Sequence, residues 1–103
     1  MERLEVRWYQ FAKPNKKRPV VILTRTSIID HLNEVTIAPL TSTIRDIPTE
    51  VILTEEDGVH SECAINCDHL QTVSKEKLGK LICVLPKSIN EEISQSIKFA
   101  LNI

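Results

Sequence analysis

The chain has few aromatic side chains and no long apolar run. One Trp, one Tyr and two Phe occur among its 103 residues, so aliphatic side chains must build the hydrophobic core. No apolar run reaches about 18 residues, the length that a membrane-spanning helix needs. The opening residues, MERLEVRW, also lack the apolar segment of a secretory signal peptide. We therefore expect a globular protein of the cytoplasm, with no membrane partner.

The sequence also lacks internal repeats, low-complexity segments and any recognisable linker. Its length is that of one ordinary domain, too short for a dinucleotide-binding fold joined to a second domain or for an eight-stranded α/β barrel. We expect residues 1–103 to form a single domain.

Cysteine is present in an odd number, at positions 63, 67 and 83. Without a secretion signal, reduced thiols are more consistent with this than a disulfide framework. Cys63 and Cys67 are separated by three residues, not the two of a zinc knuckle, while Cys83 and His60 stand apart from them. We predict no metal site and no cofactor, with the thiols used as small apolar side chains.

Charge is unevenly distributed along the chain. Residues 1–25 carry seven Lys or Arg and two Glu, a balance of +5, whereas residues 26–103 carry six and twelve, a balance of −6. A basic end of this kind indicates an anionic partner. On charge alone, a solvated charged surface explains it equally well.

β-Branched residues are abundant and favour strands: the chain has 13 Ile, 8 Val and 8 Thr. Proline, glycine and polar clusters divide them into short segments. Short helical turns are expected over residues 28–32, capped by Ser27, and over 74–78. Pro19, which has no N–H, is expected to begin its strand. The predicted strands span residues 5–11, 20–23, 34–40, 49–53, 62–66, 69–73 and 80–85.

A helix of about 14 residues is predicted after Pro86. Ser88 and Glu91 have the spacing of a capping box. An apolar stripe follows at every fourth residue, formed by Ile89, Ile93, Ile97 and Leu101. The fold class is therefore α+β and mostly β, a compact antiparallel barrel with a C-terminal helix packed on it.

Four segments, taken in order, carry the strongest signal of function. They read EVRWYQF, KRPVVILTR, VTIAPLTSTIRDIPTEV and INCDHLQTVSKEKLGKLICVL. Together they resemble the MazF/PemK toxins of type II toxin–antitoxin systems. The resemblance implies the SH3-like barrel of this family and of the related CcdB toxins, a homodimer and a cognate antitoxin. It also implies a metal-independent, sequence-specific endoribonuclease, an mRNA interferase that cuts single-stranded RNA.

Metal-free RNA cleavage uses the substrate's own 2′-OH as nucleophile and leaves a 2′,3′-cyclic phosphate and a 5′-OH. The enzyme must align the reacting atoms, move two protons and stabilise phosphoryl charge. The resemblance places Arg18 and Thr41 at the family's catalytic arginine and threonine. A guanidinium fork fits two phosphoryl oxygens, and a threonine hydroxyl can donate to one. From the residues alone, Arg18 is one more member of a basic run, and Thr41 is a loop cap.

Further positions are expected to bind RNA. Lysines near Arg18 would contact phosphates, and hydroxyls after Thr41 would assist them. Residues following the fifth predicted strand lie where the resemblance implies contact with bases. Without the resemblance, His69 is better explained as a partly buried histidine at a strand start. The predicted RNA-binding residues are Lys13, Lys16, Lys17, Ser42, Thr43, Asp68, His69 and Gln71.

The segment before Arg18 is shorter than in many family members and contains no acid. A glutamate assigned there as general base in some members therefore has no counterpart. Glu5, Asp68, His69 or Arg18 acting with water can replace it, and the sequence does not choose among them. Two other functions stay open: a CcdB-like toxin that binds a topoisomerase without catalysis, and an RNA-binding module that has lost activity.

Overall fold

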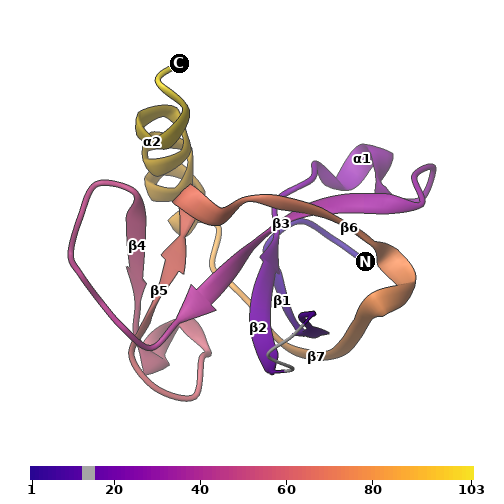
Figure 1. Ribbon diagram of the computed structural model, residues 1–103, viewed down its shortest axis with the longest axis horizontal. Coiled ribbons are helices and arrows are strands. Elements are labelled where there is room, and N and C mark those ends of the chain that lie inside the picture. The colour runs from indigo at the N-terminus through magenta and orange to yellow at the C-terminus, as the bar shows by residue number, and fades with distance from the viewer. Residues whose placement is uncertain (13–15) are drawn as a thin grey trace.

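The computed structural model describes residues 1–12 and 16–103. They form seven strands, all paired antiparallel, and one long helix (Figure 1). The strands are β1 (Glu5–Gln10), β2 (Lys17–Ile22), β3 (Glu34–Thr41), β4 (Glu50–Leu53), β5 (Cys63–Asn66), β6 (Gln71–Ser74) and β7 (Leu78–Val84). The helices are α1 (Thr26–Ile29) and α2 (Ile89–Leu101), with 3₁₀ turns η1 (Glu55–Asp57), η2 (Cys67–His69) and η3 (Lys75–Lys77). The predicted fold class is confirmed.

Strand β3 is the centre of the sheet, whose order is β4-β5-β3-β2-β1-β7. One edge of β3 pairs with β2 through Ile37, Ala38 and Pro39. The other edge pairs with β6 along its first half and with β5 at Leu40 and Thr41. Because two strands share that edge, β3 passes from one layer of the barrel to the other (Figure 1).

The hydrophobic core is aliphatic and has two parts. The larger part lies between the barrel and α2 and includes Val21, while the smaller part lies beside α1 and includes Val20 and Ile22. Successive side chains of a strand point to opposite faces, so β2 is buried on both, as its unbroken apolar run predicts.

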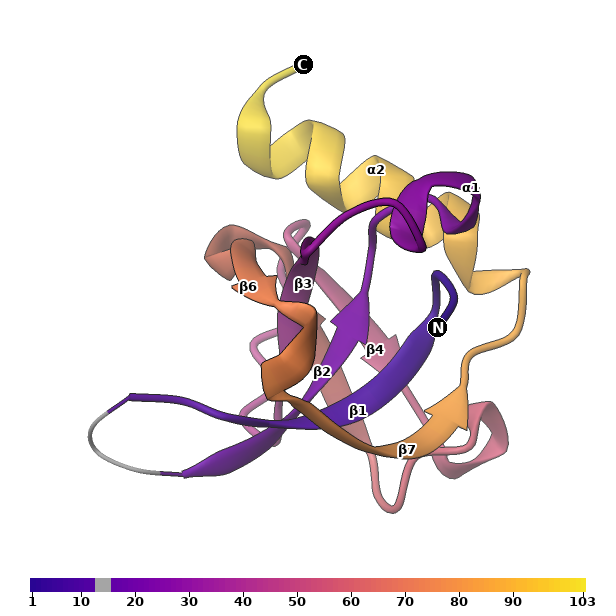
Figure 2. The same ribbon diagram turned by 90° about the vertical axis from the view of Figure 1, so that its right-hand side faces the viewer.

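Helix α2 packs on the barrel through the beginning of its predicted apolar stripe. Ile89 and Ile93 are buried, and Ile97 is half-buried against the larger core. Leu101 is 54% exposed, as the helix end projects beyond the barrel (Figure 2). The stripe is therefore confirmed as a packing face, but its last turn has no partner within the described chain.

Both side-chain caps that the sequence predicts are wrong. Helix α2 begins after Ser88, whose backbone is already helical and whose side chain caps nothing. The carbonyls of Pro86 and Lys87 accept the first N–H groups instead. In α1 the cap is Arg25, through its backbone carbonyl, and not Ser27. Backbone carbonyls accept N–H groups at the start of each helix, so these groups need no side-chain hydroxyl as a cap.

Several strand boundaries also differ from the prediction, most of them by one or two residues, and β7 begins at Leu78 where the strand was expected from residue 80. The segment expected as a strand over residues 69–73 begins as the turn η2, and β6 starts only at Gln71. Strand β2 begins earlier than expected, at Lys17, and Pro19 is its third residue. Pro19 is tolerated there because it pairs only with Trp8 of β1, before β3 joins on the other side.

Candidate active site

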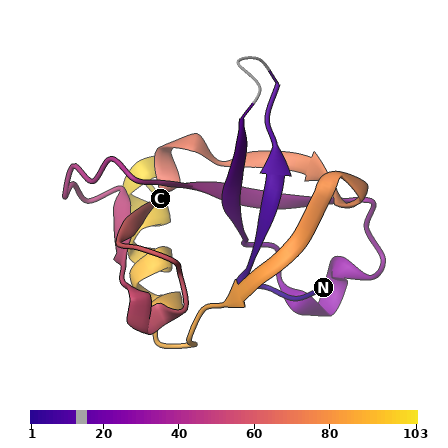
Figure 3. The same cartoon turned by 90° about the horizontal axis from the view of Figure 1, so that it is seen from below.

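Arg18 and Thr41 face each other at the end of the β2–β3 pair. The paired register runs from Ile22 opposite Ile37 to Val20 opposite Pro39. Extending it by two residues places Arg18 opposite Thr41, where the strands separate and leave space between them. Strands β1 and β2 continue together beyond the barrel (Figure 3). Residues 23 positions apart in sequence are thus brought together by strand register.

A cavity of about 430 Å³ opens at this point, here called the Arg18 cavity. Both apolar and polar side chains line it. Hydroxyl, imidazole and cationic side chains reach it from β2, from the end of β3 and from the segment before β5. The polar and aromatic side chains that line it are Trp8, Lys16, Lys17, Arg18, Thr41, Ser42, Thr43, His60 and Ser61.

The charged side chains that line the Arg18 cavity are all positive. Three cations line it, and no carboxylate is found among its described lining residues. The Arg18 side chain is exposed and has neither a hydrogen-bond nor an ion-pair partner within residues 1–12 and 16–103. Its fork of N–H donors is therefore available to an anion.

The Thr41 hydroxyl has a fixed position. Its oxygen accepts the N–H of Thr43 at 3.1 Å, the loop-capping role that the sequence allowed. That bond uses a lone pair and leaves the hydroxyl proton free to donate. The capping role and a catalytic role are therefore compatible.

A second cavity, of about 280 Å³, adjoins the first and is here called the Arg45 cavity. Arg18, Thr41 and Thr43 line both cavities. The remaining walls are Pro39, Arg45, Asn66 and His69.

Arg45 is held by the buried carboxylate of Glu50, the first residue of β4. Glu50 accepts the backbone N–H of Arg45 at 2.8 Å, its Nε–H at 2.9 Å and the N–H of Asp46 at 3.2 Å. Burial alone would raise the pKa of the Glu50 carboxyl, but the hydrogen bonds and charge of Arg45 and the N–H of Asp46 outweigh it, so that pKa lies below its ordinary value. Glu50 therefore stays ionised and fixes the loop that carries Arg45.

The predicted RNA-binding residues divide into three groups. Lys16, Lys17, Ser42 and Thr43 line the Arg18 cavity, and His69 lines the Arg45 cavity. Asp68 and Gln71 line neither, although both are exposed. Asp68 instead accepts the Thr49 hydroxyl at 2.6 Å. Lys13 lies outside the described residues.

The sequence did not indicate several residues of the site, among them Trp8, His60, Ser61, Arg45 and Asn66. Trp8 is 39% exposed, unusual for the chain's one tryptophan, and it sits beside Pro19 in the β1–β2 register. His60 was considered only as a metal ligand. The Arg45 to Glu50 spacing in RDIPTE was the one available signal for a paired arginine, and nothing in it indicated a cavity.

The structure excludes some of the residues that the sequence offered as general base, beginning with Glu5. Its carboxylate is buried, accepts Arg7 Nε–H at 2.8 Å and the Glu2 N–H at 3.1 Å, and lines neither cavity. His69 lines the Arg45 cavity, whereas Asp68 lines neither cavity. Glu5 and Asp68 are therefore poorly placed to take a proton from a substrate bound at Arg18.

The three cysteines are free thiols that belong to the apolar core or pack against it, as predicted. Burial is the main cause that raises the pKa of each thiol, in the case of Cys67 to about 11. Thiols of this kind are poor nucleophiles near neutral pH. Among the residues that the structure describes, no three His, Cys, Asp or Glu side chains are grouped to hold a metal ion.

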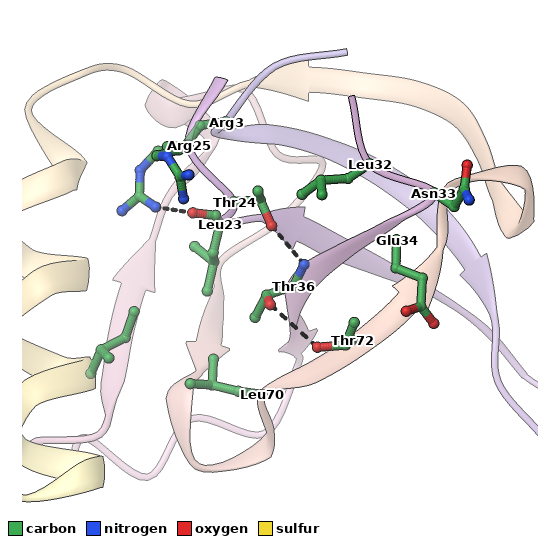
Figure 4. Close-up of a pocket in the computed structure, with 11 residues that line it drawn as sticks. Arg3, Leu23, Thr24, Arg25, Leu32, Asn33, Glu34, Thr36, Leu70 and Thr72 are labelled. Carbon is green, nitrogen blue, oxygen red and sulfur yellow. Dashed lines mark hydrogen bonds between the residues drawn. The ribbon is translucent and has the colours of Figure 1, made fainter. Parts of the chain in front are cut away.

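A groove of about 750 Å³, larger than the Arg18 and Arg45 cavities, contains none of the predicted site residues (Figure 4). It lies between the α1–β3 segment, β6 and α2, and aliphatic side chains such as Leu32, Leu70 and Ile97 line it. Its threonines are already hydrogen-bonded: Thr24 accepts the Thr36 N–H at 2.8 Å, and Thr36 meets Thr72 at 3.4 Å. Size alone is therefore a poor guide to the active site of this protein.

The fold and the Arg18 cavity define a small barrel protein with a cationic cavity at its surface. Comparison with known proteins identifies the family to which a barrel of this kind belongs. Residues 2–101 match the family described as the PemK-like, MazF-like toxin of type II toxin-antitoxin systems. The chain is 36% identical over 92 residues to endoribonuclease MazF3 of Mycobacterium tuberculosis, covering 89% of each protein.

Two solved structures have the same fold. The M. tuberculosis toxin MazF-mt6 superposes with a TM-score of 0.88 at 33% identity, over 96% of this chain and 97% of that one. An endoribonuclease in complex with its cognate antitoxin, from a mycobacterial species, gives 0.89 at 23% identity, over 100% and 96%. This chain belongs to the MazF/PemK family of toxins. No helix in its described part has the length and apolar character needed to cross a membrane.

Proposed function

We propose that this protein is a metal-independent endoribonuclease that cuts single-stranded RNA in the Arg18 cavity. The observation that carries the proposal is the meeting of Arg18 and Thr41 in a cavity whose described lining is cationic and free of carboxylates. Such a lining favours a phosphodiester. Membership of a family whose curated relatives are named endoribonucleases supports the same conclusion.

Arg18 and Thr41 stabilise the phosphoryl group during the reaction. The 2′-oxygen of the RNA forms a bond to phosphorus, and the bond from phosphorus to the 5′-oxygen breaks. The Arg18 fork binds the two phosphoryl oxygens, on which charge accumulates, and the Thr41 hydroxyl donates to one of them. The products are a 2′,3′-cyclic phosphate and a 5′-OH.

His60 is the best placed group to move protons in this cavity. It lines the same walls as Arg18 and Thr41, while Glu5 is buried in its own hydrogen bonds. Imidazole is the side chain most suited to exchanging a proton near neutral pH. His60 accepts the 2′-OH proton, and the leaving 5′-oxygen is protonated by a water molecule or by the imidazolium so formed.

The remaining polar residues hold the substrate. Lys16 and Lys17, together with Lys13, contact phosphates, and Ser42 and Thr43 donate hydrogen bonds beside Thr41. The exposed Trp8 face offers a platform on which an unpaired base stacks. Asp68 and Gln71 remain predicted base contacts, reached only by RNA that extends past both cavities.

The proposal includes two protein partners and a location. A cognate antitoxin that carries acidic and apolar residues competes with RNA for the cationic site. A second copy of the chain covers exposed apolar residues, which at the end of α2 are Phe99, Leu101 and Ile103. The cytoplasm suits three free thiols.

The decisive experiment incubates purified protein with RNA in EDTA and sequences the cut ends. Cleavage to 2′,3′-cyclic phosphate ends at recurrent sequences is the expected result. Intact RNA under these conditions would reject the proposal. RNA binding without cleavage would then indicate an inactive binding module, and binding to a topoisomerase would indicate a CcdB-like toxin.

A further inference from the structure

We infer that the Arg45 cavity is a nucleobase subsite, next to the scissile phosphate, that selects the keto oxygen at C4 of uracil or C6 of guanine over the amine that cytosine or adenine carries at that place. The inference rests on the proposed function, since it takes the ligand to be RNA. The cavity shares Arg18, Thr41 and Thr43 with the Arg18 cavity. A nucleotide whose phosphate lies on Arg18 therefore has this space beside it for a base, and about 280 Å³ is enough to hold one.

The donors of this cavity are fixed in place. Arg45 gives its Nε–H to the buried Glu50 at 2.9 Å, so the guanidinium is anchored at one edge and its terminal N–H groups are left for a ligand. The loop is further held by the two backbone N–H groups that Glu50 accepts. Asp46, in this loop, has a positive φ of 53°, a conformation that these bonds maintain.

Asn66 contributes a second fixed donor. It is 8% exposed, and its Oδ1 accepts the Asp68 N–H at 3.0 Å. That bond fixes which way the amide points, so the side-chain NH₂ is the group left for the cavity. The Thr43 hydroxyl is a further donor on the same wall.

The side-chain acceptors left in the described lining of the cavity are the Thr41 and Thr43 hydroxyls and the His69 imidazole. No carboxylate is present among the described residues that line the cavity. Asp68, an acid of η2 that could accept from a base amine, lines neither cavity and accepts the Thr49 hydroxyl at 2.6 Å. The amine at C4 of cytosine or C6 of adenine would leave donors facing donors, whereas the keto oxygen that uracil or guanine presents there satisfies them.

The test compares base preference in the full-length protein and in three variants. Asn66→Asp keeps the oxygen that accepts the Asp68 N–H but replaces the NH₂ donor by an acceptor. Arg45→Lys keeps a cation beside Glu50 but loses the two-point fork. Asn33→Asp is the matched control, because Asn33 is exposed and lines only the large groove of Figure 4. Thermal unfolding shows whether each variant folds. If Asn66→Asp does not fold, Arg45→Lys still tests the inference, because the Arg45 side chain is half-exposed and its replacement disturbs the fold less.

Cut ends are sequenced from a random RNA library, and 2′-O-methyl RNA from the same library is selected for binding without cleavage. One position beside the cut should favour uracil or guanine over cytosine and adenine by roughly tenfold, the scale of one good base contact. Asn66→Asp should remove or invert that preference, and Arg45→Lys should weaken it. Other positions should not change, and the control should match the wild type.

Two results overturn the inference. One is a wild-type protein with no position beside the cut that favours uracil and guanine over cytosine and adenine. The other is a folded Asn66→Asp or Arg45→Lys protein whose preference equals that of Asn33→Asp. The binding selection allows the two proposals to be tested separately. Absence of cleavage rejects the proposed nuclease activity, while the 2′-O-methyl RNA sequences selected for binding still show whether the protein has the proposed base preference.

Discussion

Arg18 is a surface residue that contributes little to the fold and, on our proposal, much to the reaction. We expect Arg18→Ala to lower the cleavage rate by roughly 10²–10³, the effect of removing one transition-state donor. Arg18→Lys should also fail, because an ammonium cannot form the fork. Single-turnover cleavage of an RNA oligonucleotide and the midpoint of thermal unfolding measure the two effects.

The control for Arg18 is Arg25→Ala, which removes an exposed arginine of the same basic segment that lines only the large groove. Both alanine variants should unfold at the wild-type temperature, since neither side chain has a partner in the described chain. Near wild-type cleavage by Arg18→Ala would refute its assignment.

Thr41 should affect the rate of cleavage more than the binding of RNA. Its hydroxyl proton is free while its oxygen is fixed by the Thr43 N–H at 3.1 Å, so the contact to phosphate can strengthen as charge develops. We expect Thr41→Ala to lower the single-turnover rate and to leave the affinity for 2′-O-methyl RNA nearly unchanged. Equal losses in both would assign Thr41 to substrate holding only.

At the scale of elements, the segment between β3 and β4 depends on the ionised Glu50. Its folded-state pKa lies below the ordinary carboxyl value of about 4. The stabilising effect is therefore complete above that value and is lost as the pH falls through the lower folded-state pKa. Glu50→Gln should lower the unfolding free energy by about 1–3 kcal/mol at pH 7, from weakened hydrogen bonds.

Urea unfolding between pH 2 and pH 7 measures the Glu50 prediction. The difference between wild type and Glu50→Gln should shrink as the pH falls. Glu34→Gln is the control, since Glu34 is exposed at the start of β3. A difference that stays constant down to the lowest pH would show that the charge of Glu50 does not stabilise this segment.

Helix α2 contributes to the core at its beginning and not at its end. Ile93 is fully buried, whereas Leu101 on the same stripe is 54% exposed. We expect Ile93→Ala to lower the unfolding free energy by about 2–5 kcal/mol. Leu101→Ala should change it by less than about 0.5 kcal/mol in the monomer. Denaturant unfolding measures both, and equal losses would contradict the partial docking of the helix.

For the whole molecule, the segregated charge determines how RNA binds. Lys16 and Lys17 line the Arg18 cavity and would neutralise phosphates without reading sequence. Replacing both by Gln should weaken the binding of 2′-O-methyl RNA and lower the slope of log affinity against log salt by about 1–2. Fluorescence anisotropy over a salt series measures this. Lys98→Gln, on the exposed face of α2, should leave the slope unchanged.

Much of the fold could be predicted because its signals are local. The apolar run at Val20 indicated a strand buried on both faces, and the four-residue spacing from Ile89 indicated a helix that packs on the sheet. The predicted caps at Ser27 and Ser88 were wrong, since nearby backbone carbonyls supplied the acceptors. Local pattern does not determine which of two nearby acceptors is used.

The candidate site, like the fold, was predictable in part from the sequence. The sequence by itself determined a β-rich domain with an aliphatic core and a basic end, and its motifs indicated Arg18 and Thr41. Only the tertiary structure decided that these two residues face each other, that His60 and Trp8 join them, and that a buried Glu50 anchors Arg45. The reason is physical: register and curvature of the barrel arise from contacts between distant strands, and no local pattern contains them.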